Sequence, residues 1–573
     1  MQQVKTPWYS SYDGVREHLE YPDYSIFMLL EENAKKREGL TAYNYFGKCA
    51  TYKEFLEQIE AAAKAFLQMG VKPKDVISIC MPNTPEAIVS FYAVNKIGAV
   101  ANMIHPLSAE NEIKYYVNLT ESKVIVSIDL ALNKIIHVLP ETKLEKIIQV
   151  SVADSMPVAI SVGYFMKKGR KLHFEKCDIT TKWADFIRNG RMYEGETLYK
   201  PDKNDTAAIL YSGGTSGFPK GIELTNLNFN ALAIHSVEIC KTLHEGDKIL
   251  SIMPVFHGFG LGICVHTVLY LGATAVILPQ FNAAEFDKLL TKYKPNIIAG
   301  VPSLFEVMLK NKKMEGVDLS FLHLVISGGD SLSEGLKLKV DKFLEEHGSD
   351  AKVREGYGLT ECVTGSCLIP VNKYKAGSIG IPYPDTYYKV INPETLEEMP
   401  YGEDGEIVLS GPTVMKGYLN EPEETANTLR LHKDGKVWLH TGDLGYMDED
   451  GFLFFKQRIK RMIISSGYNI YPQYLENIID SVPEVLLSCV IGIDHPLKVQ
   501  VAKAFIVLRE GYEPTDEIRQ KIRDVCEKNL AKYSWPFEYE FRKELPKTLV
   551  GKVAFTQLIE EEKAKNANKE KET

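Results

Sequence analysis

The sequence predicts an α/β protein with a large N-terminal domain of parallel-sheet α/β subdomains and a small β-barrel-like part, followed by a small α+β C-terminal domain. Two observations lead to this fold class. Between residues 24 and 327, short apolar runs recur and each is followed by a helical pattern, as in parallel sheets with crossover helices. After residue 377, glycine and proline punctuate alternating strands, which favours a smaller antiparallel or barrel-like part.

The first elements follow in chain order. Amphipathic stretches at 25–36 and 52–69 predict helices, and the apolar run 76–81 predicts a buried strand. Further strands are expected at 207–211, 273–278, 297–300, 322–327, 405–411 and 451–456. With 573 residues, of which 45% are hydrophobic, the chain can bury a large core in more than one domain.

The pattern changes at one short charged segment, residues 457–461. Two helices and two strands are expected beyond it, at 472–481, 487–493, 502–509 and 513–529. We therefore expect two domains, 1–457 and 458–573, both of ordinary size. Residues 560–573 are mostly Lys, Glu and Asn, and we expect them to form a frayed tail.

Charge and cysteine usage exclude several classes of protein. Lys and Arg number 67 and Asp and Glu 76, so the formal charge is −9, which gives no long-range attraction for nucleic acid. Nine scattered cysteines, without a CxxC pair, indicate reduced thiols and no cysteine zinc site. No signal peptide and no apolar stretch of spanning length is evident. We expect a cytoplasmic protein.

The strongest motif is LYSGGTSGFPKGIEL at 210–224, in which an apolar strand runs into a glycine- and hydroxyl-rich loop. Such loops bind phosphate oxygens because glycine lets backbone amides come close. The spacing matches neither GxxxxGK[ST] nor GxGxxG. The residues expected to contact phosphate are Ser212, Gly213, Gly214, Thr215, Ser216, Gly217 and Lys220.

This string resembles the phosphate loop of the AMP-forming acyl-adenylate superfamily, which includes acyl-CoA synthetases, firefly luciferase and the adenylation domains of peptide synthetases. Six further strings resemble its signatures in order: NKIGAVANMIHP at 95–106, YGLTE at 357–361, GEIVLSGPTVMKGY at 405–418, WLHTGD at 438–443, RIKRMIISSGYNIYP at 458–472 and PKTLVGK at 546–552. The resemblance covers residues 24–557. It implies an enzyme that joins a carboxylic acid to AMP from ATP with Mg²⁺, and then passes the acyl group to a thiol such as coenzyme A.

The resemblance also implies roles for the nucleotide site. Glu361 would hold Mg²⁺ and Thr360 would reach the α-phosphate, because one carboxylate with phosphate oxygens and waters suffices for this ion. Asp443 would accept hydrogen bonds from the ribose hydroxyls. The adenine would lie against Gly328, Gly329, Asp330, Tyr357 and Gly358. The string GGDSL also resembles a carrier-protein attachment site at Ser331, but it follows a strand inside the body, so we favour the adenine role.

The C-terminal motifs imply a mobile small domain. By resemblance, Lys552 would bridge the substrate carboxylate and the α-phosphate, a role that suits a compact ammonium on a flexible stem. Arg458 would contact ribose and phosphate, and Lys460 would be the hinge. Rotation there would exchange Lys552 for a different face, which includes Gly467, when the thiol attacks.

The acid is indicated by MPVFHGFGLG at 253–262. His257 stands where domains that select amino acids carry an Asp for the substrate ammonium, and an unpaired buried charge costs roughly a few kcal/mol. The string instead resembles acyl-CoA and aryl-CoA ligases, in which the histidine lines or gates the acid pocket. Phe256, Phe259 and Leu261 would form an apolar wall, although the intervening glycines could serve helix packing alone.

We therefore expect an acid-CoA ligase, with a medium- or long-chain fatty acid as the first choice and an aryl or other hydrophobic acid as the second. Delivery to a carrier protein, and a sensor that only binds nucleotide, remain alternatives. Residues 153–176 are apolar and then basic. They indicate either peripheral contact with an anionic membrane or a basic entrance for CoA phosphates.

Overall fold

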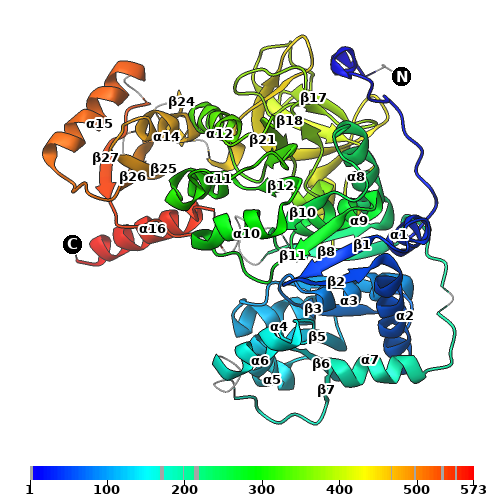
Figure 1. The fold of residues 1–573 in the computed structure, drawn as a ribbon. Helices are drawn as coiled ribbons and strands as arrows, with labels where there is room; N and C mark the ends of the chain where they lie inside the picture. The colour runs from blue at the N-terminus through cyan, green and yellow to red at the C-terminus, as the bar shows by residue number, and fades with distance from the viewer. Residues whose placement is uncertain are drawn as a thin grey trace. The chain divides into compact units, whose positions relative to one another are not determined.

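The protein is described by a computed structural model that covers residues 4–167, 173–197, 199–211, 219–461, 463–465, 468–470, 472–495, 498–530, 534–548 and 552–572 (Figure 1). Contacts divide the chain into two compact units. The first comprises residues 1–212, 219–387 and 410–439, and the second comprises 213–218, 388–409 and 440–573. Each unit has its own sheets and is described by itself.

An eight-stranded sheet in the first unit has the order β19-β9-β8-β4-β3-β5-β6-β7. Its strands are β3 Val76–Cys80, β4 Val100–Ile104, β5 Val124–Ile128, β6 Lys146–Val150, β7 Thr180–Lys182, β8 Thr206–Tyr211, β9 Gly221–Thr225 and β19 Gly417–Tyr418. All are parallel from β8 to β7, and β9 and β19 add antiparallel partners. The middle strands β3, β4 and β5 are mostly apolar and almost wholly buried, as is usual for a parallel sheet with both faces covered.

A nine-stranded sheet in the same unit has the order β16-β15-β14-β13-β12-β10-β11-β1-β2. Its strands are β1 Thr41–Tyr45, β2 Lys48–Thr51, β10 Lys248–Ser251, β11 Thr274–Ile277, β12 Ile297–Gly300, β13 Leu324–Ser327, β14 Val353–Tyr357, β15 Cys367–Leu368 and β16 Ile381–Pro382. Strands β14, β13, β12, β10, β11 and β1 run parallel. Their carboxyl ends therefore meet at one edge of the sheet.

Helices connect these strands. They are α1 Ile26–Lys35, α2 Tyr52–Gln68, α3 Pro85–Lys96, α4 Glu110–Leu119, α5 Leu132–Val138, α6 Val158–Lys167, α7 Trp183–Met192, α9 Val268–Leu271, α10 Phe286–Tyr293, α11 Pro302–Lys310, α12 Glu334–Glu346 and α13 Pro422–Thr428. Helix α2 shows why they begin where they do. Thr51 accepts from the Glu54 backbone amide and Glu54 from that of Thr51, so two otherwise unsatisfied donors are capped.

Two central helices, α8 Asn226–Ile239 and the π-helix η5 Phe259–Thr267, pack together in the first unit. Gly262 of η5 permits this close approach, because a Cβ there would lie 2.7 Å from Leu232 of α8. A Cβ on Gly260 would lie 2.0 Å from the Pro254 carbonyl oxygen, in the segment that precedes η5. Gly262 therefore serves helix packing, which was the second of the two roles that the sequence left open.

The second unit begins with strands of a five-stranded sheet that has the order β17-β18-β21-β20, with β22 paired antiparallel to β21. They are β17 Tyr387–Ile391, β18 Gly405–Ser410, β21 Val437–Met447 and β22 Leu453–Arg458. The long strand β21 is shared: its first residues pair with β20 Leu429–Leu431 in the first unit, and Asp443 to Met447 pair with β22. The contacts thus group residues 388–409 and 440–457 with the C-terminal part, whereas the sequence predicts a boundary at 457.

The C-terminal part is an α+β layer, as predicted. Its strands are β23 Ile463–Ser465, β24 Tyr468–Ile470, β25 Val485–His495, β26 Val499–Leu508 and β27 Glu538–Phe541, and its helices are α14 Pro472–Asp480, α15 Asp516–Asn529 and α16 Phe555–Glu572. The expected frayed tail, residues 560–573, is instead helical as far as Glu572. Its start is anchored because Leu558 is fully buried and Glu562 accepts from buried Lys503 at 2.8 Å.

The α/β class with parallel sheets is confirmed, together with the predicted strand that became β3 and the helices that became α1 and α2. Within the described part of the chain, the helices are all too short or too polar to cross a membrane.

Candidate active site

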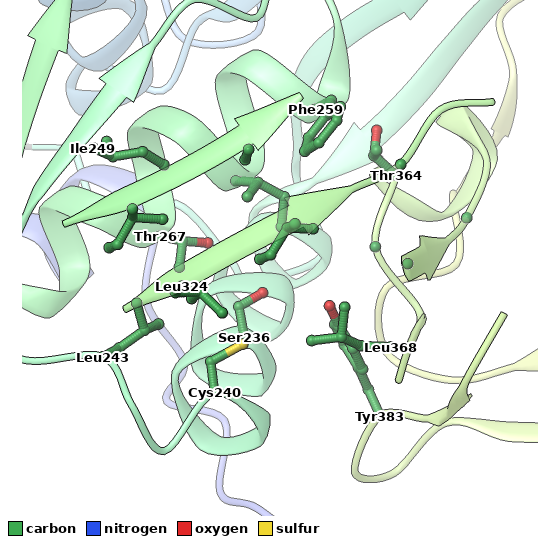
Figure 2. Close-up of a pocket in the computed structure, with 18 of the residues that line it drawn as sticks. Ser236, Cys240, Leu243, Ile249, Phe259, Thr267, Leu324, Thr364, Leu368 and Tyr383 are labelled. Atoms are coloured by element: carbon green, nitrogen blue, oxygen red, sulfur yellow. The ribbon is translucent and has the colours of Figure 1, made fainter. Parts of the chain in front are cut away.

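An apolar pocket lies in the first unit between α8, η5 and the strands of the nine-stranded sheet (Figure 2). It encloses about 740 Å³ of space, including solvent at its open mouth. Figure 2 shows Ile249 and Leu324 on one wall, Ser236 and Cys240 on another, and Phe259 and Thr364 together at one end. The described residues that line the pocket include no Asp, Glu, Lys, Arg or His.

Two glycine turns form part of the pocket lining, at the carboxyl ends of β13 and β14. These strands are parallel neighbours, with Ser327 paired with Glu355, so the next residues of each come together. Gly328, Gly329, Tyr357 and Gly358 all line the pocket. The carboxyl edge of an open parallel sheet is where ligands commonly bind.

Glycine is required at two of these positions. Gly329 has a φ of +81°, in the left-handed region. A Cβ on Gly358 would lie 1.6 Å from the Thr364 carbonyl oxygen, so no side chain fits. By contrast, Asp330 and Ser331 are exposed, and the Asp330 carboxylate accepts from the Ser331 backbone amide at 2.9 Å.

The turn after β14 is strained. It contains the short 3-10 helix η8 Thr360–Cys362, followed by Val363 with a φ of 53° and Thr364 with a φ of 81°. Two consecutive β-branched residues in the left-handed region cost of order 1–3 kcal/mol each. Thr364 lines the pocket, so the strain lies where the sequence places its catalytic residues, a common property of functional sites.

Glu361 is held by a residue to which the sequence analysis gave no role. The Tyr418 hydroxyl donates to Glu361 Oε1 at 2.9 Å, and the Met415 amide donates to the Glu361 carbonyl at 2.8 Å. Burial, and then the neighbouring Glu361 carboxylate, raises the pKa of Tyr418. The phenol therefore remains a donor at neutral pH. Tyr418 is the last residue of the GEIVLSGPTVMKGY motif, and this motif was the sequence signal that could have indicated its role.

Lys220 belongs to the same polar cluster. Its ammonium pairs with Glu424 of α13 and lies 4.9 Å from the centroid of the Tyr418 ring. A cation over an aromatic face is attracted by the ring quadrupole. The structure thus brings Lys220 and Glu361 to the same tyrosine. Ser212, Gly213, Gly214, Thr215, Ser216 and Gly217 lie outside the described residues.

His257 lies just before η5 and is half-buried. Its Nδ1 accepts from the Phe259 amide at 3.2 Å. Of the expected apolar wall, only Phe259 lines the pocket. Phe256 instead contacts His105, with ring centroids 4.2 Å apart and ring planes tilted by 50°, and Leu261 is fully buried. The next residue, Gly258, packs tightly against Thr364, since its Cβ would lie 2.4 Å from the Thr364 hydroxyl. His257 is therefore beside the strained turn.

In the second unit, Asp443 and Arg458 meet across β21 and β22. They are cross-strand partners, and Arg458 Nε lies 3.1 Å from Asp443 Oδ1. The Asp443 side chain is 2% exposed, whereas that of Arg458 is 52% exposed. The two predicted ribose residues are thus adjacent, with the arginine facing solvent.

The remaining predicted residues also belong to the second unit. Lys552 closes a turn in which its amide donates to the Thr548 hydroxyl at 3.2 Å and its carbonyl accepts from the Thr548 amide at 2.7 Å. Its side chain is exposed. Lys460 lies in η9 Ile459–Arg461, with its side chain outside the described part, and Gly467 is also outside it.

Comparison with known proteins gives one consistent result. A family model described as "AMP-binding enzyme" matches residues 30–419, and one described as "AMP-binding enzyme C-terminal domain" matches residues 474–552. A long-chain-fatty-acid–CoA ligase of Bacillus subtilis (strain 168) is 34% identical over 98% of this chain and 99% of its own length.

Another relative with the same name, from Escherichia coli O6:H1, is 30% identical over 99% of this chain and 100% of its own length. Among solved structures, the anthranilate CoA ligase AuaEII in complex with anthranoyl-AMP has a TM-score of 0.82 at 24% identity. The match covers 96% of this chain and 99% of that one.

Proposed function

The chain belongs to the AMP-binding enzyme family, and from this premise we propose that it is an AMP-forming fatty acyl-CoA synthetase. In the first step, a carboxylate oxygen of the fatty acid attacks the α-phosphorus of ATP, so that acyl-AMP forms and pyrophosphate leaves. In the second step, the sulfur of coenzyme A attacks the acyl carbon, AMP leaves, and the thiol proton is released. Both full-length relatives reported above are named as long-chain-fatty-acid–CoA ligases.

The observation that carries the acid's chemistry is the lining of the pocket. An alkyl chain could bind there without needing a polar or charged partner, because the described walls are largely apolar and hold no formal charge. An amino acid would bury its ammonium without a partner, which is costly. The pocket's lining includes the glycine turns after β13 and β14, so a chain inside it would carry its carboxylate toward those turns.

The nucleotide would bind at the same turns. We assign adenine contacts to Tyr357, which offers a ring face, and to the backbone at Gly328, Gly329 and Gly358. Asp330 would act at the exposed rim. In the second unit Asp443 would bind the ribose hydroxyls, and Arg458 would reach the ribose and a phosphate. Lys220, with the loop from Ser212 to Gly217, would bind the leaving phosphates.

The residues near Glu361 fit a magnesium ion. A carboxylate is a hard oxygen ligand, and Tyr418 donates to Oε1 only, so Oε2 can serve as a ligand alongside phosphate oxygens and water. When bound, Mg²⁺ supplies positive charge that offsets the repulsion between the two anions. Thr360, buried beside Glu361, would donate to the α-phosphate.

Lys552 would complete the charge neutralisation by bridging the attacking carboxylate and the α-phosphate. An exposed ammonium on a closed turn can be presented to this anion pair and withdrawn from it. We propose that residues 458–573 rotate as a domain about Lys460, and that the segment containing Gly467 faces the thiol in the second step. His257, next to the strained turn, would line the path between the acid carboxylate and the thiol.

The test is a panel of acids in a CoA-dependent AMP-release assay. Medium- and long-chain fatty acids, benzoate and leucine are compared at equal concentrations. We expect kcat/KM for a long-chain acid to exceed that for benzoate by roughly tenfold or more, and leucine to be inactive. Preference for benzoate would identify an aryl-acid ligase, the second candidate that the match to an anthranilate ligase favours. Activity with a carrier protein but not with CoA would contradict the proposed acceptor.

Helix α6 supports peripheral contact with a membrane. None of its ten residues is buried, and Val158, Val162, Phe165 and Met166 recur at helical spacing while more than half exposed. The basic residues Lys167, Lys168, Arg170 and Lys171 follow in the sequence. An apolar helix face next to clustered positive charge fits an anionic lipid surface. Sedimentation with phosphatidylglycerol vesicles but not with phosphatidylcholine vesicles would support this, and equal sedimentation of a Phe165→Glu variant would contradict it.

A further inference from the structure

We propose that His244, Asp247 and His323 form a binding site for a divalent transition metal, best suited to Zn²⁺. One ligand atom from each residue lies within 4.8 Å of the others. His323 Nε2 lies 3.1 Å from Asp247 Oδ1, and His244 Nδ1 lies 3.9 Å from Asp247 Oδ2. The two imidazole rings meet edge to face, with centroids 5.6 Å apart. This site is separate from the residues proposed to bind ATP, acid or CoA.

The nine-stranded sheet positions the three residues. His244 and Asp247 lie on the turn that leads into β10, and His323 directly precedes β13. Both strands flank β12, with Ile249 and Leu324 each paired with Ile297. The ligands therefore gather at the amino ends of these strands, which is the edge opposite the glycine turns.

Hydrogen bonds fix this edge. The His323 amide donates to the Asn296 carbonyl at 3.0 Å, and the Lys248 amide donates to Asn296 Oδ1 at 3.0 Å. The His244 amide donates to Asp247 Oδ2 at 2.8 Å. The carboxylate is thus oriented by a backbone donor, as second-sphere partners orient metal ligands. Asp247 is 9% exposed, so its position is set by packing as well.

The ligand set suits zinc. Two imidazoles and one carboxylate, with a fourth position left for water, form a known class of tetrahedral zinc site. Zinc bonds of about 2.0–2.2 Å place neighbouring ligand atoms about 3.3 Å apart. The His323–Asp247 pair already has this spacing. Only His244 has to approach, and its side chain is 69% exposed and can rotate into place.

A second histidine with carboxylate neighbours offers a contrast. His137 contacts Glu110 through Nδ1 at 2.8 Å and Glu175 through Nε2 at 2.9 Å. Because its two partners lie on opposite sides of the ring, they cannot converge with it on one ion. His137→Gln therefore removes a histidine of similar surroundings without removing a proposed ligand.

The position of the site suggests its effect. Leu243 and Leu324, each adjacent in sequence to a ligand, line the apolar pocket (Figure 2). A bound ion would fasten the turn that carries Leu243 to the start of β13, at the end of the pocket away from the glycine turns. If the pocket holds the acid, as the proposed function requires, the ion would stiffen the wall that limits chain length.

The test measures metal binding alone, without acid, ATP or CoA, so its failure is distinct from failure of the proposed function. The full chain is stripped with a chelator, and Zn²⁺ is titrated in competition with a chromophoric chelator. Co²⁺ absorption in the visible range reports the coordination geometry. We expect one zinc per chain and a tetrahedral cobalt spectrum.

Matched variants locate the site. His244→Gln, His323→Gln and Asp247→Asn should each weaken Zn²⁺ binding by at least about 10- to 100-fold, while His137→Gln should leave it unchanged. His244→Gln removes an exposed ring, so it is the variant least able to disturb folding, and the melting temperature of each stripped variant checks this. Absence of zinc binding by the unmodified chain, or unchanged affinity in His244→Gln and His323→Gln, would overturn the proposal and leave an ordinary hydrogen-bonded pair.

Discussion

The two units hold their proposed site residues in different ways. In the first unit, Gly328, Tyr357 and Gly358 lie at the carboxyl ends of buried parallel strands, and at Gly358 the neighbouring backbone leaves no room for a side chain. In the second, Lys552 sits on an exposed turn in which its backbone exchanges hydrogen bonds with Thr548. A site that must match the shape of a base or an alkyl chain needs a packed framework, whereas a charge that must be presented during one step needs an accessible position. A substitution at a packed position should therefore lower both stability and activity, whereas a substitution of the exposed lysine should lower activity alone.

Lys552→Ala should give the largest effect on activity and almost none on stability. Loss of one charge that stabilises the transition state costs about 10²–10³-fold in rate, while an exposed side chain contributes little to folding. Acid-dependent pyrophosphate exchange measures the first step, and thioester formation from supplied acyl-AMP measures the second. Lys543→Ala, which removes another exposed lysine nearby, is the control. Equal loss of both steps in Lys552→Ala would contradict its assigned role.

Glu355→Gln tests the packed framework of the first unit through the pH dependence of folding stability. Burial raises the pKa of Glu355 to about 7, despite a hydrogen bond from the Leu332 amide and the nearby Lys337. Because this exceeds the unperturbed value of 4.5, the folded protein binds the proton more tightly than the unfolded chain. The stability from this group is complete below about pH 4.5 and is lost as pH rises through about 7.

Glutamine is uncharged and can still accept from the Leu332 amide. The variant should therefore gain stability relative to the unmodified protein between pH 5 and pH 8, by up to about 3 kcal/mol. Denaturant unfolding at several pH values measures this difference. A difference that does not change with pH would show that Glu355 does not titrate in this range.

Gly358→Ala should lower stability and activity together, which would mark the difference from Lys552→Ala. The new methyl group would meet the Thr364 carbonyl, and relief by backbone movement costs roughly 1–3 kcal/mol. Gly335→Ala is the control, since a Cβ there meets nothing within 4 Å at the start of α12. Thermal unfolding and AMP release are measured for both variants. Unchanged stability and activity of Gly358→Ala would contradict the difference that we draw between the two units.

Tyr418→Phe should have the smallest effect. It removes the hydroxyl that donates to Glu361 but keeps the ring beneath Lys220. We expect the Mg²⁺ concentration for half-maximal rate to shift by about tenfold or less, with kcat at saturating Mg²⁺ nearly unchanged. Tyr512→Phe, at a half-exposed tyrosine, serves as the control. A change in kcat without a change in Mg²⁺ dependence would assign Tyr418 a different role.

Local sequence patterns predicted much of the fold because the relevant physics is local. The predicted strand at 76–81 became β3, which reads VISIC and is almost wholly buried, and Thr51 and Glu54 cap the predicted helix α2 from three residues apart. The glycines at 329 and 358 were found for the same reason. Their motifs encode the backbone conformations that a close approach requires.

Contacts between distant segments were not predictable. Tyr418 reaches Glu361 across 57 residues, and Lys220 reaches Glu424 across 204, so both depend on how the eight-stranded sheet pairs β9 with β19 and on where α13 follows. The helical end of the chain was missed similarly, because Glu562 gains its partner Lys503 only once β26 is in place. Two of the proposed metal ligands, Asp247 and His323, precede different strands and lie 76 residues apart in the sequence.

The seam between η5 and α8 has a consequence for the evolution of selectivity. Gly260 and Gly262 touch backbone and a neighbouring leucine so closely that larger residues there would displace the helix. Neither glycine lines the cavity, so a lineage adapting to shorter or longer substrates would keep the path of η5 and change the side chains that surround the cavity. Viable substitutions should accumulate at lining residues such as Phe259 and Ile263 on η5 and Ile249, Ala299 and Ile326 on the opposing strands.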